Sequence, residues 1–166
     1  MKRMDYMAVA DRAMEQIKAG AFLTVKVGQA MNTMTIGWAT IGYVWQQPIM
    51  MVAVRLSRHT FSLIEAAADF TVSIPATGME TELDFCGTRS GREVDKFEAC
   101  ALRVAPAQKV TSPIIQTPGL HYECQIVYKS AMDPAHLSPA YDAALYARQD
   151  YHTLYFGEIV DCYEME

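Results

Sequence analysis

The chain has 166 residues and a formal net charge of −5, with 51% apolar and 20% charged residues. This length suits one domain with a sizeable core over residues 1–166, and the acidic balance argues against a nucleic-acid-binding surface, which would concentrate Lys and Arg. No apolar run reaches the roughly 18 to 20 residues of a membrane span, and no secretory leader is recognised, so we expect a cytoplasmic protein with neither membrane nor nucleic acid as a partner.

The first elements expected along the chain are a helix and a strand. Residues 5–18 carry apolar side chains at helical spacing, with Asp5 as the N-cap and Gly20 as the stop. The N-terminal helical segment, residues 1–19, is expected to cover a barrel end or a subunit contact. Ala21–Val27 alternates between two faces, as a strand does.

Two further strands are expected over residues 33–45 and Ile49–Val54, joined by the turn Gln46-Gln47-Pro48. Gly37, inside the first of them, marks either a bend of a barrel or a place where a flat ring lies against the main chain, and both interpretations stay open. Ile49–Val54 is continuously apolar, which predicts that both of its faces are buried.

A polar run, Arg55–Thr60, separates this strand from a helix expected over residues 60–68. A charge at the end of a buried strand is costly unless it is paired. One candidate partner of Arg55 is a phosphate, because arginine offers two parallel donors and helix starts offer free N–H groups. The other is a carboxylate such as Glu65, and the residue pattern does not choose between them.

The second half of the chain is expected to mix short helices with long strands. The expected elements are a strand over Phe70–Ile74, helices over 79–85 and 94–100 flanking a basic loop over 87–92, an edge stretch over 101–110, a loop over 111–120, and strands over 121–132 and 152–163. Residues 133–150 read as an excursion with a helical turn at 140–148, a candidate lid or dimer arm. Gly157 predicts a bulge in the closing strand, and the strand count favours an antiparallel barrel.

The cysteines and histidines show no metal-binding pattern. Cys86, Cys100, Cys124 and Cys162 form no CxxC pair and the four histidines lack ligand spacing, so we expect reduced thiols and no metal. Cys124 and Cys162 are expected in the core, whereas the reactivity of Cys86 stays open. Nucleophile elbows, zinc-protease motifs and phosphate-binding loops are absent as well.

Four short blocks, in this order, resemble one known family. They are Asn32-x-Met34-Thr35-x-x-Trp38, Arg55-x-Ser57-x-x-Thr60, Ser90-Gly91-Arg92-x-x-Asp95-Lys96-Phe97 and His152-Thr153-x-x-Phe156-Gly157-Glu158-Ile159. Together they resemble the flavin reductase-like family of FMN-binding split barrels, which includes the flavoredoxins. The resemblance covers residues 20–163. It implies a mainly β fold, an antiparallel split β-barrel with short flanking helices, and a homodimer with FMN near the subunit interface.

The resemblance also implies roles for individual residues. It assigns Arg55, Ser57 and Thr60 to the FMN phosphate. Backbone groups of three further residues would meet the edge of the flavin ring; these are Met34, Thr35 and Leu56. The remaining assignments are Asn32 at the ring or ribityl hydroxyls, Trp38 at the pocket wall, and His152 at the open ring face. Ser90 and Lys96 belong to the loop that closes toward the flavin, with Lys96 the candidate for a second contact to the phosphate or for a contact to the ring.

The implied function is an oxidoreductase that passes electrons from NADH or NADPH through FMN to a flavin or another acceptor. Two alternatives stay open: an electron carrier of the flavoredoxin type that exchanges electrons with a redox protein, and a non-enzymatic FMN- or ligand-binding module. No GxGxxG fingerprint for a dinucleotide is present. Hydride transfer to a flavin needs no protein acid or base in the hydride step itself, so no catalytic residue is assigned.

Overall fold

Antiparallel strands dominate the computed structural model, which describes residues 1–166. The strands are β1 (Lys2–Arg3), β2 (Ala21–Val27), β3 (Ala30–Ile36), β4 (Ala39–Val44), β5 (Gln47–Arg55), β6 (Asp69–Pro75), β7 (Val104–Ala105), β8 (Ile114–Ile115), β9 (Gly119–Ala131) and β10 (His152–Met165). Eight of them form one sheet in the order β3-β2-β6-β9-β10-β5-β4, with β1 paired to β10, while β7 and β8 pair separately.

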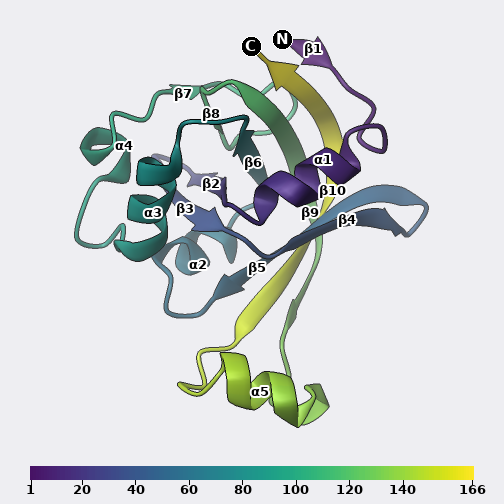
Figure 1. The fold of residues 1–166 in the computed structure, drawn as a ribbon, viewed down its shortest axis with the longest axis vertical. Coiled ribbons are helices and arrows are strands. Elements are labelled where there is room, and N and C mark those ends of the chain that lie inside the picture. Colours follow the sequence, from purple (N-terminus) through teal and green to yellow (C-terminus); the bar gives the residue numbers. More distant parts are fainter.

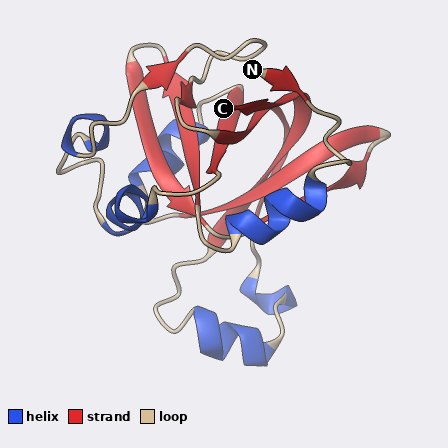
Figure 2. Ribbon diagram, turned by 45° about the horizontal axis from the view of Figure 1, so that its top comes forward, coloured by secondary structure: helices blue, strands red, loops and turns tan.

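The large sheet curls round into a barrel that stays open along one seam (Figure 2). β3 and β4 follow each other in the chain but lie at opposite ends of the sheet order. Gly37 and Trp38 carry the chain across the seam, where the N–H of Ala53 donates to the Trp38 carbonyl at 3.3 Å. This arrangement is an antiparallel split barrel, and the predicted fold class is confirmed.

Short helices cover the outside of the barrel (Figure 1). They are α1 (Ala10–Ile17), α2 (His59–Ile64), α3 (Glu80–Thr88), α4 (Lys96–Ala99), the 3-10 turn η1 (Pro134–His136) and α5 (Pro139–Leu145). α2, α3 and α4 lie beside β2 and β3, whereas α5 lies away from the barrel at the end of the arm formed by β9 and β10. No helix combines the length and the apolar character that crossing a membrane requires.

The core fills the barrel interior and extends under α1. Its largest fully buried side chains include Tyr122, Tyr155 and Phe70. Gly157 lies at a register shift between β9 and β10, where an added Cβ would meet the Phe70 ring at 2.8 Å, so the bulge predicted at this glycine is confirmed and has a packing reason. Cys124 and Cys162 are buried in this core, as predicted.

The N-terminal helix is shorter than the predicted helix over residues 5–18. α1 begins after Val9, its N-cap, and the prediction of Asp5 as the N-cap is wrong. The Asp5 carboxylate instead accepts from the N–H of Met7 at 2.9 Å and closes a turn ahead of the helix. An aspartate can satisfy a local turn as well as a helix end, and sequence alone does not separate the two.

The single strand predicted over residues 33–45 is wrong, because the chain breaks at Gly37 and Trp38 into β3 and β4. The turn after β4 is also shifted by one residue from its predicted place. Trp45 and Gln46 form it with φ of 53° and 61°, values that match the two-residue hairpin turn favoured by strand twist. Pro48 consequently lies within β5, opposite Tyr43. Burial of both faces of Ile49–Val54 is confirmed, with Met51 the least buried of the run.

Other boundaries move by a few residues. The helix predicted over 60–68 ends at Ile64, the helix predicted over 79–85 runs on to Thr88 into the predicted basic loop, and only Val104–Ala105 of the edge stretch is a strand. The excursion over residues 133–150 is present, but its helix is Pro139–Leu145 rather than 140–148.

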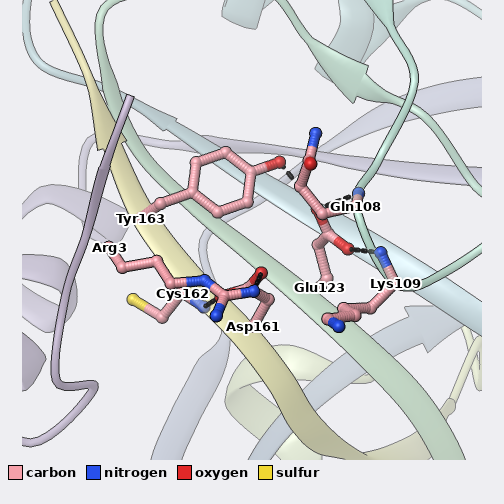
Figure 3. A network of polar contacts seen from close by, with 7 residues as sticks. All are labelled: Arg3, Gln108, Lys109, Glu123, Asp161, Cys162 and Tyr163. Carbon is pink, nitrogen blue, oxygen red and sulfur yellow. Dashed lines mark hydrogen bonds and ion pairs between the residues drawn. The ribbon is translucent and has the colours of Figure 1, made fainter.

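Two buried carboxylates, Glu123 and Asp161, hold neighbouring segments to the barrel (Figure 3). Glu123 accepts from the N–H groups of Gln108 and Lys109 at 2.7 and 2.6 Å and from the hydroxyl of Tyr163 at 2.7 Å. Arg3 reaches Asp161 at 3.0 Å and ties β1 to β10. Each carboxylate has partners, so this network explains how the loop after β7 is held.

Candidate functional site

Three neighbouring cavities lie along β3, β5, α2 and the segment after α3. The first cavity, about 200 Å³, is lined by Met34, Thr35, Ile36, Gly37, Trp38, Ala53, Arg55, Arg58, Gly87 and His152. The polar cavity, about 100 Å³, is lined by Ser57, Arg58, His59, Thr60, Thr88, Arg89, Ser90, Gly91 and Lys96. The loop cavity, about 300 Å³, is lined by Met31, Asn32, Gly91, Arg92, Glu93, Val94, Asp95, Lys96 and Phe97. Arg58 is common to the first two, and Gly91 and Lys96 to the last two.

The walls of the first cavity come from both sides of the barrel seam. Arg55, the last residue of β5, is paired with His152, the first residue of β10, so their side chains stand side by side. Trp38, from the crossing between β3 and β4, lies 4.7 Å from the His152 ring between centroids and 6.0 Å from the Arg55 guanidinium. The cavity therefore joins flat aromatic surface and exposed backbone with two arginines, Arg55 and Arg58.

His152 is held in its neutral form. Its Nδ1 lies 2.7 Å from the hydroxyl of Tyr146. Burial, with a smaller contribution from the positive charge of Arg55 and an opposing one from Asp150, lowers the pKa of His152 to about 4. At neutral pH the imidazole is therefore uncharged and can serve as a hydrogen-bonding wall.

The polar cavity has no apolar lining residue. Arg58 donates to the carbonyls of Gly87 and Cys86 at 2.7 and 3.0 Å, and Arg92 donates to the Ser57 carbonyl at 3.0 Å. These bonds tie the end of α3, and the segment after it, to the start of α2. Burial lowers the pKa of Arg58, an effect that nearby negative charge opposes. The result is a small cleft with concentrated positive charge.

Lys96 is the most deeply buried of these cations, with 2% of its surface exposed. Its Nζ donates to the carbonyls of Thr33 and Cys86 at 3.0 and 2.8 Å, and no carboxylate pairs with it. Burial lowers its pKa to about 8, and the charge of Arg58 acts in the same direction. A buried cation without a counter-charge is costly, and a bound anion would relieve that cost.

Close packing shapes the wall between the polar and loop cavities. The Asn32 amide donates to the Thr60 hydroxyl at 2.8 Å. A Cβ at Gly91 would collide with the Asn32 amide and would lie 2.9 Å from the His59 ring, so the loop can approach only because this residue is glycine. Nδ1 of His59 is buried without a hydrogen-bond partner in the protein.

Arg55 and Ser57 are both engaged by the end of the excursion. The Ser57 hydroxyl and N–H donate to the Asp150 carboxylate at 2.5 and 3.2 Å. Arg55 donates to the carbonyls of Asp150 and Leu145 at 2.8 and 3.2 Å. Glu65, the carboxylate considered for Arg55, instead accepts from Lys129 and Tyr155.

The structure brings most of the predicted site residues to these cavities, but not all to one place. Met34, Thr35, Trp38, Arg55 and His152 line the first cavity, while Ser57, Thr60, Ser90 and Lys96 line the polar cavity and Asn32 lines the loop cavity. The three residues assigned to one phosphate are thus divided between two cavities. Leu56 is half-exposed and lines none of the three.

Sequence reasoning missed several residues of the site. Arg58 was within reach of prediction, because it lies in the same polar run as Arg55. Arg89 was part of the basic loop but received no role. Tyr146 and Asp150 carried no signal, since they lie in the excursion, the part of the chain least like the family.

The thiol of Cys86 lies beside the site and is shielded from solvent. Cys86 is fully buried, and burial together with neighbouring Cys100 raises its pKa to about 12. The thiolate is the reactive form of cysteine, so burial and the raised pKa both disfavour reaction of Cys86 at neutral pH.

Comparison with known proteins gives one matching family model, described as the flavin reductase like domain, over residues 16–166. An uncharacterized protein of Archaeoglobus fulgidus is 29% identical over 106 residues, 64% of this chain and 59% of that protein. An uncharacterized protein of Pyrococcus abyssi is 26% identical over 136 residues, 80% and 66% respectively. The matched region thus spans less than two thirds of either relative's length.

Solved structures of the same fold include flavin-binding proteins. Flavoredoxin from Methanosarcina acetivorans is 26% identical with a TM-score of 0.68, covering 89% of this chain and 68% of its own. The FMN-binding protein from Thermus thermophilus with bound 1-cyclohex-2-enone is 25% identical with a TM-score of 0.67, covering 87% and 69%. The NADH:FAD oxidoreductase of Streptomyces globisporus, at 19% identity, a TM-score of 0.67 and coverage of 99% and 87%, shares the fold.

Proposed function

The chain belongs to the flavin reductase-like family, and we propose that it is an FMN-dependent oxidoreductase that passes electrons from NADH or NADPH to a flavin or another acceptor. The observation that carries this proposal is the shared wall of two unlike cavities. One has flat aromatic and backbone surface, the other only polar and cationic side chains, and Arg58 lines both. FMN has the same division, a planar ring at one end and a phosphate at the other.

The residues of the polar cavity fit a phosphate. Lys96 is a buried ammonium without a carboxylate, and Nδ1 of His59 is buried without a partner. Arg58 and the hydroxyls of Thr60 and Ser90 add donors of the kind that phosphate oxygens accept. We therefore propose that the phosphate lies in the polar cavity. Its main positive partners are then Arg58 and Lys96 rather than Arg55.

The first cavity fits the flavin ring. Bound FMN supplies the hydride and electron transfer that amino acid side chains cannot. Backbone groups of Met34 and Thr35 would orient the ring edge, Trp38 would exclude water from one side, and Arg55 would neutralise negative charge near the ring. His152 would face the molecule that exchanges electrons with the flavin.

A second candidate function is an electron carrier of the flavoredoxin type. The flavoredoxin of Methanosarcina acetivorans among the similar structures favours it, and so does the absence of a GxGxxG fingerprint in this chain. Stopped-flow mixing of the FMN-loaded protein with NADH or NADPH separates the two functions. Rapid bleaching of the flavin spectrum supports the reductase, whereas bleaching only by a reduced redox protein supports the carrier.

We also propose that the active form is a homodimer. Trp45, Tyr128 and Phe156 form an aromatic cluster on the outer face of the sheet, with ring centroids 5.6 to 5.9 Å apart. Trp45 and Tyr128 are about half-exposed, and a second copy of the chain would cover them. Sedimentation at micromolar concentration tests this: a dimer that Trp45→Glu converts to monomer supports it, and a wild-type monomer contradicts it.

A further inference from the structure

Within the excursion over residues 133–150, the Tyr146 side chain packs against residues that line the first cavity. α5 has no buried residue of its own, whereas Tyr146, directly after it, is 4% exposed. The Tyr146 ring lies edge-on to Trp38 at 6.4 Å between centroids, and the Arg55 guanidinium lies 5.0 Å from it. The excursion therefore docks on the barrel at the wall of the proposed flavin site, although most of it lies away from the barrel (Figure 1).

The hydroxyl of Tyr146 has two neighbours that can accept its proton. Nδ1 of His152 lies at 2.7 Å and the sulfur of Met132 at 3.4 Å. An imidazole nitrogen is a much stronger acceptor than a thioether, so the single hydroxyl proton belongs to the shorter bond. Burial raises the pKa of Tyr146 and lowers that of His152, so both are neutral at neutral pH. A neutral imidazole that accepts at Nδ1 carries its proton at Nε2.

Nε2 of His152 is then a free donor. This nitrogen has no hydrogen-bond partner within the protein. It is also not sealed in the core, unlike Nδ1 of His59. The residue itself lines the first cavity. A donor that is fixed in direction and open to the cavity is suited to hold an acceptor oxygen of a bound molecule.

We infer that Tyr146 is a positioning residue of the redox site: its hydroxyl fixes His152 as the Nε2–H tautomer, and Nε2–H donates to the carboxamide oxygen of the nicotinamide that stacks on the flavin. The part concerning the nicotinamide rests on the proposed function. The bond between Tyr146 and His152 does not, because it exists in the chain without any ligand. The excursion therefore supplies a part of the site rather than only a cover.

The tautomer is tested in the flavin-free protein by nitrogen-15 NMR of the histidine rings, with His152→Gln to assign the signals. The wild type is expected to show the Nε2–H form alone. Tyr146→Phe, which keeps the ring, should give a mixture of tautomers and a higher His152 pKa, although Arg55 and Asp150 still face the imidazole. A wild type with the proton at Nδ1, or a Tyr146→Phe spectrum identical to it, overturns the inference.

A matched control is Tyr151→Phe. The Tyr151 ring stacks on Tyr146 at 4.9 Å between centroids, and its hydroxyl donates to Asp142 at 2.7 Å instead of to the site. Removing that hydroxyl tests whether any disturbance of the excursion has the same effect. The His152 signals should not change, and a loss of the Nε2–H form in this variant as well would contradict a specific role for Tyr146.

The kinetic test compares NADH with its thionicotinamide analogue, whose sulfur is a weak acceptor. Tyr146→Phe should raise the KM for NADH about three- to tenfold, the effect of one lost hydrogen bond, with FMN affinity and kcat little changed. For the analogue, the two proteins should differ less. Equal KM values for NADH overturn the nicotinamide assignment. A wild type that binds no FMN refutes the proposed function instead, and the NMR result still decides the role of Tyr146.

Discussion

Lys96 should make FMN binding depend on pH, because its ammonium is buried and lacks a carboxylate partner. Its pKa is lowered from 10.5 to about 8, which corresponds to about 3 kcal/mol in favour of the neutral amine. A phosphate in the polar cavity favours the ammonium instead and raises that pKa in the complex. The affinity for FMN should therefore change little near pH 7 and should have fallen about twofold by pH 8. It should then fall as the pH rises above 8, by at most about tenfold per pH unit.

The assay is a fluorescence titration of FMN between pH 7 and 9.5, a range above the second phosphate pKa of about 6. Lys96→Met should bind FMN more weakly at pH 7 and should lose the dependence on pH. Riboflavin, which has the ring but no phosphate, serves as the control and should show no decline. An FMN affinity that stays constant to pH 9.5, or a decline that persists in Lys96→Met, would refute the reasoning.

Three further changes test neighbouring parts of the site. Arg55→Ala should weaken FMN binding by more than about 1 kcal/mol, because it removes the positive charge proposed to lie near the flavin ring. An unchanged titration removes Arg55 from the site. Gly91→Ala should lower FMN affinity, because the new Cβ meets Asn32 and His59 and forces the wall of the polar cavity to shift. Full affinity would show that this wall is not used. Asp150→Asn should tighten FMN binding by about 0.5 to 1 kcal/mol at low salt, because it removes a negative charge beside the phosphate region. Weaker binding would indicate that the carboxylate is needed for the fold of the loop.

Strands whose burial pattern is local were predictable from the sequence. The strands predicted over Ala21–Val27 and Ile49–Val54 both lie within a residue or two of the observed strands, although Ala21–Val25 is buried on both faces. The break at Gly37 and Trp38 was not predictable. It exists because the chain crosses from one end of the curled sheet to the other, and the curl depends on strands far away in the sequence.

The site was predictable as a set of segments rather than as a geometry. The polar run contains Arg55 and Arg58 three residues apart, and only the tertiary fold shows that Arg58 faces the polar cavity while Arg55 meets the excursion. The approach of Gly87 to Arg58 joins segments 29 residues apart. Tyr146 lies in a segment without a family motif, so no pattern indicated that it contacts His152.

The most direct test of the account is the affinity for FMN relative to riboflavin, measured for the wild type and for Arg58→Met. The account predicts that FMN binds at least about tenfold more tightly than riboflavin, because charge-assisted bonds to the phosphate are strong, and that Arg58→Met narrows this ratio. Arg103→Met, which removes an exposed arginine outside the three cavities, should leave the ratio unchanged. Equal affinities for the two flavins in the wild type, or no binding of either, would contradict the central claim.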